Sequence, residues 1–292
     1  MKKRKKKYKK RSYPEVRLIG LDLDGTTLTS DKVLTPHTKE LLEDCLADGI
    51  HVLPATGRVH AGIPDYLRQI RGMRYVILSN GACVMDLQKE EVLYRNCIPW
   101  DRALDLFDTL EKYHTFYDVY ANGEGWCEGR FLDHLDEFRI EPEIQKLVRM
   151  SRNRVDDLRE WMRQNQAPVE KLNMFFAEEE ERQRAYSELS EMPDLAVTCS
   201  LSNNLEINHA SCNKGDAMKN LGRILQIPLE NMMACGDGNN DLEMIKQAGI
   251  GVAMANGEKA LKKVADYITK TNDEEGVAYA IEHFCNQKGK RK

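Results

Sequence analysis

Short apolar runs alternate with segments of helical spacing near the start of the chain. Residues 16–21 form a mostly apolar run bounded by polar residues, which predicts a buried strand. Thr35 followed by Pro36 is a helix-start signal, and the helix should end at Gly49. The next expected elements are a strand at 50–55, a helix over about 59–71 and a strand at 75–78. This β-α-β-α-β order predicts a parallel sheet with helices on its faces.

The same alternation returns in the last third of the chain. Helices are expected at 214–225, 241–248, 257–264 and 274–285, and strands at 232–235, 249–253 and 267–268. We therefore predict one α/β domain with a doubly wound, mostly parallel sheet, built from residues 14–83 and 208–287.

The segment between these halves, residues 84–207, has a different pattern. Strands are expected at 91–97, 115–121, 170–177, 195–200 and 203–208, and helices at 101–113, 156–164 and 179–191. This order of elements predicts an inserted α+β domain with its own core, connected to the main domain near residues 78–85 and 206–210.

The composition is that of a globular protein. Of the 292 residues, 41% are hydrophobic and 31% are charged, and no run approaches the roughly 18 apolar residues of a membrane span. Eight cysteines occur without a C-x-x-C pair or a secretory signal, which favours a reduced, cytoplasmic protein. The histidines and cysteines show no zinc-site spacing.

The first residues form a basic arm. Nine of the first eleven are Lys or Arg, and no apolar segment of a signal peptide follows them, so residues 1–13 are expected to be disordered. The arm could bind nucleic acid or another acidic surface, or it could be a solvated tail without a specific partner. We favour the second interpretation.

Two carboxylates directly follow the first predicted strand. Asp22 and Asp24 belong to the sequence Asp-Leu-Asp-Gly-Thr-Thr-Leu, and alternation along an extended segment places both on the same side. Ligands bind at the carboxyl ends of parallel strands, so this is where a site is expected. Carboxylate oxygens suit Mg²⁺. A loop with two solvated aspartates is the alternative.

Further polar residues follow other predicted strands or open helices. Asp237, Asn240 and Asp241 come directly after the strand at 232–235, where they could bind a cation or simply cap the next helix. Their spacing does not fit a calcium-binding EF-hand loop, which needs Gly at its sixth and Glu at its twelfth position.

A hydroxyl and an unhindered backbone follow the second strand. Thr56 and Gly57 supply the kind of groups that cradle a phosphate. Lys214 opens the helix after the insertion, and its ammonium group could neutralise a phosphate there. Neither signal is specific by itself.

Taken together and in this order, the segments resemble the motifs of the haloacid dehalogenase superfamily, and they are most similar to its Cof-type, subclass IIB hydrolases. The similar segments are residues 22–26, 55–58, 79–82, 214–215, 236–241 and 248–254, followed by Asn256. The resemblance covers about residues 16–285. Pro54, Ala255 and Gly257 depart from the usual pattern without affecting a chemical role.

The resemblance implies a Mg²⁺-dependent phosphatase that hydrolyses small phosphomonoesters, either sugar phosphates or phosphorylated cofactors, through an aspartyl-phosphate intermediate. Asp22 would be the nucleophile and a metal ligand, and Asp24 the general acid and base, with its backbone carbonyl on the metal. Asp237 would complete the protein's metal ligands, with Asp241 beside or behind it. The groups expected to hold the phosphoryl oxygens are the Leu23 backbone N–H, Thr56, Gly57, Lys214 and Asn240.

The insertion would then be a cap that closes over the site and sets specificity. Cap residues that could face the substrate are His114, Asn122, Trp126, Arg130, Asn173 and Asn203. Two alternatives remain: a phosphosugar mutase of the same subclass, and a non-catalytic protein that binds nucleic acid through its basic arm. We expect no membrane contact, and either a monomer or a homodimer.

Overall fold

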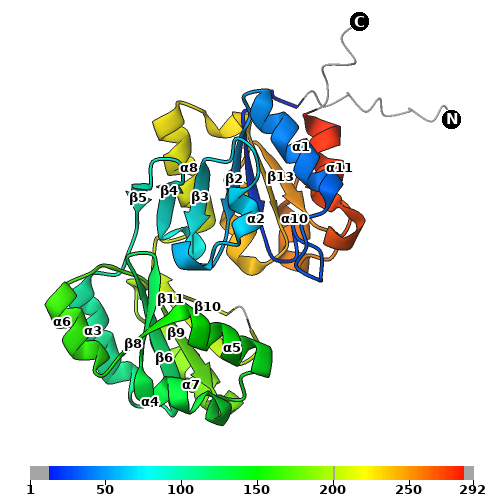
Figure 1. Ribbon diagram of the computed structural model, residues 1–292. Helices are drawn as coiled ribbons and strands as arrows, with labels where there is room; N and C mark the ends of the chain where they lie inside the picture. Colours follow the sequence, from blue (N-terminus) through cyan, green and yellow to red (C-terminus); the bar gives the residue numbers. More distant parts are fainter. Residues whose placement is uncertain (1–12, 200, 286–292) are drawn as a thin grey trace, which may run out of the picture.

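Two β-sheets organise the protein, which we describe from a computed structural model (Figure 1). The structure describes residues 13–199 and 201–285. Of the predicted basic arm, residues 1–12 therefore lie outside the described residues. Among the described helices, none combines the length and the apolar character needed to cross a membrane.

The larger sheet has eight strands in the order β14-β13-β12-β1-β2-β3-β4-β5. Its bounds are β1 (Leu18–Asp22), β2 (His51–Ala55), β3 (Tyr75–Leu78), β4 (Cys83–Asp86), β5 (Glu91–Arg95), β12 (Met232–Gly236), β13 (Ile250–Ala253) and β14 (Tyr267–Ile268). The strands from β14 to β3 pair in parallel, whereas β4 and β5 form an antiparallel edge. The central strand, β1, is buried throughout.

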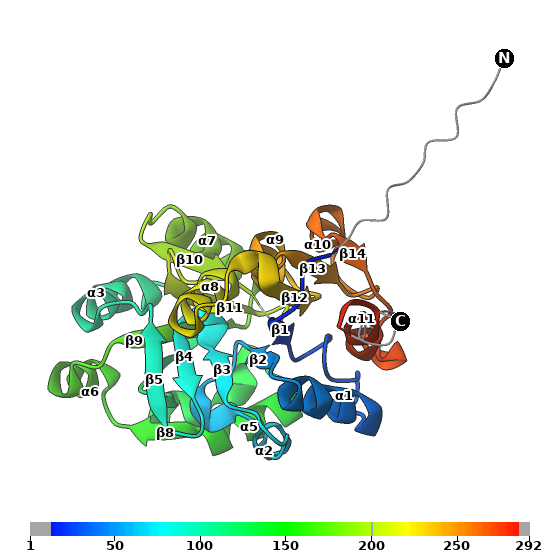
Figure 2. The same cartoon turned by 90° about the horizontal axis from the view of Figure 1, so that it is seen from above.

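Helices cover both faces of this sheet (Figure 2). Leu21 of β1 packs in one apolar cluster with residues of α1 (Pro36–Ala47) and α11 (Gly276–Phe284). Leu18, on the opposite face, packs in another cluster with residues of α8 (Lys214–Leu225) and α9 (Leu242–Gln247). α10 (Lys259–Val264) packs beside α9 and β13. The doubly wound α/β core predicted from the sequence is confirmed.

The helix expected over 59–71 is much shorter than predicted. A 3-10 turn (His60–Gly62) and α2 (Asp65–Arg68) take its place. Gly62 and Pro64 account for the difference, because glycine weakens a helix interior and Pro64, lacking an N–H, directly precedes α2 rather than continuing one helix.

The strand expected at 91–97 was wrongly assigned to the insertion. β5 pairs with β4, which was not predicted, and the two extend the larger sheet as an antiparallel hairpin. The apolar pattern identifies a strand but not the sheet that it joins, and an antiparallel hairpin needs only a short turn to continue the same sheet.

The smaller sheet has six strands in the order β10-β11-β9-β6-β7-β8. Its bounds are β6 (Thr115–Ala121), β7 (Glu124–Glu128), β8 (Arg152–Val155), β9 (Val169–Phe176), β10 (Leu195–Thr198) and β11 (Asn204–His209). Four of these strands were predicted within two residues. β7 and β8 were not, because Glu-Gly-Trp-Cys-Glu and Arg-Asn-Arg-Val lack a clear apolar alternation.

The smaller sheet has one apolar and one mixed face. Tyr117 and Val119 of β6 share an apolar cluster with residues of the helices α3 (Trp100–Leu110), α6 (Leu158–Asn165) and α7 (Glu179–Ser190). The alternate residues Asp118 and Tyr120 point to the other face. One end of that face is covered by α4 (Gly129–Asp133) and α5 (Pro142–Ser151), which pack on Phe116. Residues at the other end contact the loops after β2 and β3 of the larger sheet.

Candidate active site

The carboxyl ends of β1, β2 and β12 and the start of α8 bring the predicted site residues together. Asp22 is the last residue of β1, and its carbonyl oxygen accepts a hydrogen bond from Thr27 Oγ1 at 2.5 Å. The following turn is closed by the Leu23 carbonyl, which accepts from the backbone N–H of Leu28 at 2.9 Å. Gly25 in this turn has φ +83°, which a residue without a side chain adopts readily.

Three carboxylates form a group that could hold a cation. Asp22, Asp237 and Asp241 each offer an oxygen, and these oxygens lie within 4.8 Å of one another. Thr26 Oγ1 donates to Asp237 Oδ1 at 2.6 Å, and Asp241 Oδ2 accepts from the backbone N–H of Asp237 at 3.0 Å. These bonds orient the carboxylates. Among the described residues this is the only such acidic group, and the Asp24 carboxylate is not part of it.

Lys214 lies between two of these carboxylates. Its Nζ donates to Asp22 Oδ1 at 2.5 Å and to Asp241 Oδ1 at 2.7 Å, and its side chain is 0% exposed. Lys214 is the first residue of α8, whose N-cap Asn213 accepts from the N–H of Asp216. The lysine that was expected to bind phosphate is thus in direct contact with the expected nucleophile.

Burial controls the protonation of this group. Loss of solvation raises the pKa of Asp22 to about 8, although the adjacent Lys214 opposes the shift. Burial also raises the pKa of Asp237, against the opposing hydrogen bond from Thr26. For Lys214, burial lowers the pKa, but Asp22 and Asp241 outweigh it and the net pKa is raised. A charged lysine therefore sits among crowded carboxylates.

Asp24 is turned toward two cations. Arg58 Nη2 lies 2.9 Å from Asp24 Oδ1, and Lys32 Nζ lies 3.0 Å from the same oxygen. Partial burial raises the pKa of Asp24, but the charges and hydrogen bonds of Arg58 and Lys32 outweigh burial and the net pKa is lowered. In this arrangement Asp24 is ionised.

The loop after β2 supplies Thr56 and Gly57. Thr56 is buried, and its Oγ1 accepts from the backbone N–H of Arg58 at 3.1 Å. The loop after β3 lies against it, because the N–H of Asn80 donates to the Thr56 carbonyl at 3.0 Å. Asn240, from the loop after β12, donates from Nδ2 to Asn80 Oδ1 at 3.2 Å.

The structure thus gathers the predicted site residues around one sheet edge, and it adds residues that were not predicted to act there. Asn80 was part of a recognised motif but had no assigned role, and it contacts Asn240. Lys171 of β9 donates to the Gly57 carbonyl at 3.1 Å, and Glu206 of β11 accepts from Asn80. Only the motif at 79–82 gave a signal for any of them.

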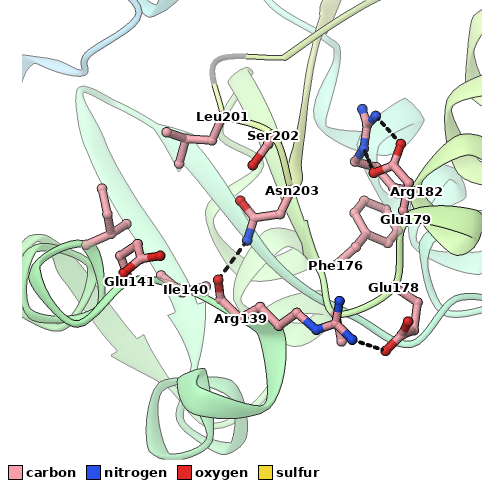
Figure 3. A pocket seen from close by; sticks show the side chains of 12 residues that line it. Arg139, Ile140, Glu141, Phe176, Glu178, Glu179, Arg182, Leu201, Ser202 and Asn203 are labelled. Atoms are coloured by element: carbon pink, nitrogen blue, oxygen red, sulfur yellow. Dashed lines mark hydrogen bonds and ion pairs between the residues drawn. The ribbon is translucent and has the colours of Figure 1, made fainter.

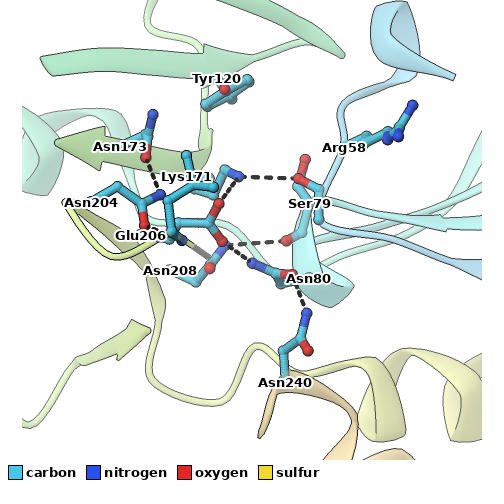
Figure 4. A network of polar contacts seen from close by, with 12 residues as sticks. Arg58, Ser79, Asn80, Tyr120, Lys171, Asn173, Asn204, Glu206, Asn208 and Asn240 are labelled. Atoms are coloured by element: carbon cyan, nitrogen blue, oxygen red, sulfur yellow. Dashed lines mark hydrogen bonds and ion pairs between the residues drawn. The ribbon is translucent and has the colours of Figure 1, made fainter. Parts of the chain in front are cut away.

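The six cap candidates lie in different places. Asn173 is on the mixed face of the smaller sheet, and its Oδ1 accepts from Asn204 (Figure 4). Trp126 instead belongs to the helix-covered cluster and stacks on Trp161 at 4.3 Å between ring centroids. Arg130 pairs with Glu128 at 2.5 Å. Asn122 adopts φ +56° in the turn between β6 and β7.

The last two candidates lie at the end of the smaller sheet remote from the carboxylates. His114 directly precedes β6 and contacts the ring of Phe138. Asn203 lines a cavity of about 360 Å³ and donates to the Arg139 carbonyl at 3.3 Å (Figure 3). Since Phe176 and Lys171 are five residues apart along β9, this cavity lies roughly 16 Å from the Lys171 contact.

Comparisons with known proteins agree on one family. The family described as haloacid dehalogenase-like hydrolase matches residues 19–281. Phosphatase YwpJ of Bacillus subtilis is 31% identical over 285 residues, which cover 92% of this chain and 100% of that protein. The 5-amino-6-(5-phospho-D-ribitylamino)uracil phosphatase YcsE of the same organism is 27% identical, covering 92% and 96%.

The fold has close counterparts among solved structures. A haloacid dehalogenase-like hydrolase from B. subtilis superimposes with a TM-score of 0.78 at 29% identity, over 92% of this chain and 99% of that chain. The subclass IIB sugar phosphatase BT4131 shares the fold, with a TM-score of 0.76 at 24% identity over 92% and 99%.

Proposed function

The chain belongs to the haloacid dehalogenase-like hydrolases and is a phosphatase of that family. We propose that it is a Cof-type, subclass IIB enzyme that depends on Mg²⁺ and hydrolyses small phosphorylated metabolites through a phosphorylated Asp22. The observation that carries this proposal is the contact of Asp22 with a buried lysine and two further carboxylates at the carboxyl ends of the parallel strands. In parallel α/β sheets, ligands bind at these strand ends.

The acidic group fits a hard divalent cation. Oxygen atoms of Asp22, Asp237 and Asp241 lie within 4.8 Å of one another, and carboxylate oxygens are the ligands that Mg²⁺ prefers. The backbone carbonyl of Asp24 is a further proposed ligand. When bound, Mg²⁺ would neutralise charge on the phosphoryl oxygens and help to align them.

The reaction proceeds in two displacements. An Asp22 carboxylate oxygen attacks phosphorus, the bond between phosphorus and the substrate oxygen breaks, and Asp24 donates a proton to the leaving alkoxide. Water then attacks the phosphorus, Asp24 takes a proton from it, and the bond between phosphorus and Asp22 breaks to release phosphate. A covalent intermediate divides one difficult step into two easier ones.

Four groups besides Lys214 are proposed to hold the phosphoryl oxygens. These are the Leu23 backbone N–H, Thr56, Gly57 and Asn240. Lys214 contacts the nucleophile directly at 2.5 Å, so it offsets negative charge there as phosphate approaches. Preorganised donors of this kind stabilise the charge of the transition state, which is the main requirement of phosphoryl transfer.

Substrate specificity is assigned to the smaller sheet and its helices. We propose that this part of the chain, residues 98–209, acts as a cap over the site. Its mixed face carries Lys171, Asn173 and Glu206 beside the core loops. Such polar groups suit a hydroxyl-rich leaving group. Relatives named as phosphatases of 5-amino-6-(5-phospho-D-ribitylamino)uracil make that compound one candidate, with sugar phosphates as the other.

Three measurements test the proposal. Asp22→Asn should abolish phosphate release while the circular dichroism spectrum is retained; substantial turnover by this variant would refute the nucleophile. EDTA should silence the enzyme and Mg²⁺ should restore it, and activity that persists without metal would refute the cofactor. A panel of phosphorylated metabolites, assayed for free phosphate and for isomers, identifies the substrate and separates a phosphatase from a mutase.

A further inference from the structure

A buried ion pair of the smaller sheet reaches the loops of the proposed phosphate site (Figure 4). Lys171 of β9 and Glu206 of β11 lie 2.8 Å apart and are 3% and 7% exposed. Lys171 Nζ also donates to the Gly57 carbonyl at 3.1 Å. The pair is therefore shared between the smaller sheet and the loop after β2.

Glu206 fixes the orientation of a neighbouring amide. Asn80 Nδ2 donates to Glu206 Oε2 at 2.7 Å. An ionised carboxylate only accepts hydrogen bonds, so the NH₂ of Asn80 must face Glu206 and its carbonyl oxygen must face away. That oxygen accepts from Asn240 Nδ2 at 3.2 Å. The contacts thus run from Glu206 through Asn80 to Asn240.

The backbone and the neighbouring glycine hold Asn80 in this place. Asn80 adopts φ +59°, a left-handed conformation that asparagine and glycine tolerate best. A Cβ atom at Gly57 would lie only 2.9 Å from Asn80 Oδ1. The absence of a side chain at Gly57 therefore lets the Asn80 carboxamide lie close against the loop after β2.

We propose that Glu206 and Lys171 are positioning residues that orient Asn240 for phosphate through the carboxamide of Asn80. The inference rests on the proposed function, because it takes Asn240 as a phosphate ligand. It assigns two residues of the smaller sheet a role in holding the phosphate end of the substrate. Neither residue has to touch the substrate for this role.

Replacing Glu206 by Gln tests the direction of the hydrogen bonds that run from Asn240 through Asn80 to Glu206. Glutamine offers one acceptor and one donor where Lys171 and Asn80 both need an acceptor. The ammonium group of Lys171 only donates, so it keeps the amide oxygen of the new glutamine, and the glutamine NH₂ faces Asn80. The Asn80 carboxamide must then turn over, and Asn240 loses its acceptor.

The experiment measures binding of inorganic phosphate in the presence of Mg²⁺ by titration calorimetry, which needs no turnover. Glu206→Gln should weaken phosphate binding by about 10- to 100-fold, the range typical of residues that orient a ligand-binding group. Glu206→Asp, which keeps two acceptors, should lose less. Glu178→Gln, a surface carboxylate of the same sheet domain paired with Arg139, is the matched control and should bind like the wild type.

A double-mutant cycle separates positioning from general stabilisation. If Glu206 acts through Asn240, Glu206→Gln combined with Asn240→Ala should bind phosphate no more weakly than Asn240→Ala alone. The proposal would be overturned if the fold-losses of phosphate affinity in the two single variants multiply in the double variant. It would also be overturned if Glu206→Gln binds phosphate like the wild type. If Glu206→Gln does not fold, Asn80→Gly breaks the same chain of contacts without backbone strain and is combined with Asn240→Ala instead.

The outcome is distinguishable from failure of the proposed function. If the wild type binds phosphate and the double-mutant cycle is non-additive, but no phosphomonoester is hydrolysed, the positioning roles stand and the phosphatase is refuted. If the wild type hydrolyses substrates but the losses in the variants multiply, the phosphatase stands and the positioning roles are refuted. A wild type that does not bind inorganic phosphate would overturn the positioning proposal.

Discussion

Lys214→Met should destabilise the metal-free protein strongly. The substitution keeps most of the side-chain length and removes the charge that lies 2.5 Å from Asp22 and 2.7 Å from Asp241. Lys214 is completely buried, so water cannot replace it beside the carboxylates. Removing one partner of a buried ion pair costs about 3–5 kcal/mol, because the remaining charge is left without compensation.

The loss should be visible in thermal unfolding. At about 2–4 °C per kcal/mol for a large domain, the midpoint in EDTA should fall by about 6–20 °C. Mg²⁺ should raise the midpoint of the variant more than that of the wild type, since a divalent cation supplies the missing positive charge to the same carboxylates. Circular dichroism at neutral pH, with EDTA or with Mg²⁺, measures both effects.

A matched control separates burial from charge. Lys112→Met removes a lysine from an exposed pair with Glu188, at 2.6 Å and with the Lys112 side chain 57% exposed. Exposed pairs contribute less than about 1 kcal/mol, so this variant should unfold close to the wild type. Equal midpoints for the two variants in EDTA, or no added response to Mg²⁺ in Lys214→Met, would refute the reasoning.

Three further substitutions test other contacts. Gly57→Ala places a Cβ 2.9 Å from a neighbouring amide oxygen and should weaken inhibition by inorganic phosphate about tenfold, whereas Gly62→Ala, whose Cβ would have ordinary contacts, should not; equal effects would contradict the close packing. Trp126→Ala should lower the free energy of unfolding, measured in urea, by up to about 3 kcal/mol and leave KM unchanged, because Trp126 packs in an apolar cluster. A raised KM would instead indicate that Trp126 contacts the substrate. Burial raises the pKa of Asp86, but hydrogen bonds from its arginine partner and from backbone N–H groups outweigh it, so the net pKa is lowered from about 3.8. Its contribution is therefore present above that pH and lost as pH falls through the folded-state value, and the stability difference between wild type and Asp86→Asn should shrink between pH 6 and pH 3; a constant difference would exclude this linkage.

The parallel strands of the core were predictable because they are buried on both faces. Residues 18–22 and 232–236 are mostly apolar runs bounded by polar residues; Asp22 ends the first run and Asp237 directly follows the second. Once these strands pair in parallel, their carboxyl ends must lie at the same end of the sheet. The meeting of Asp22 with Asp237 follows from that geometry, without knowledge of any side-chain contact.

The edges of both sheets were less predictable. β8 reads Arg-Asn-Arg-Val, and Arg152 is nevertheless largely buried because it pairs with Asp118 at 2.6 Å. Such pairing hides the apolar alternation on which strand prediction depends. Lys171 and Glu206 lie on strands that were predicted, but they are 35 residues apart, so their pairing becomes evident only when the strands are placed side by side.

Asp24 shows the difference between proposing a catalytic group from a motif and knowing its protonation state. The family resemblance implied that Asp24 is a proton donor, and such a donor must hold a proton when the alkoxide leaves. The folded contacts oppose this, because Arg58 and Lys32 lower the pKa of Asp24. The free energy of protonating Asp24 therefore includes that of separating it from both cations. Arg58 directly follows Gly57, whose carbonyl accepts from Lys171, so the same loop connects the smaller sheet to the proposed proton donor as well as to the proposed phosphate site.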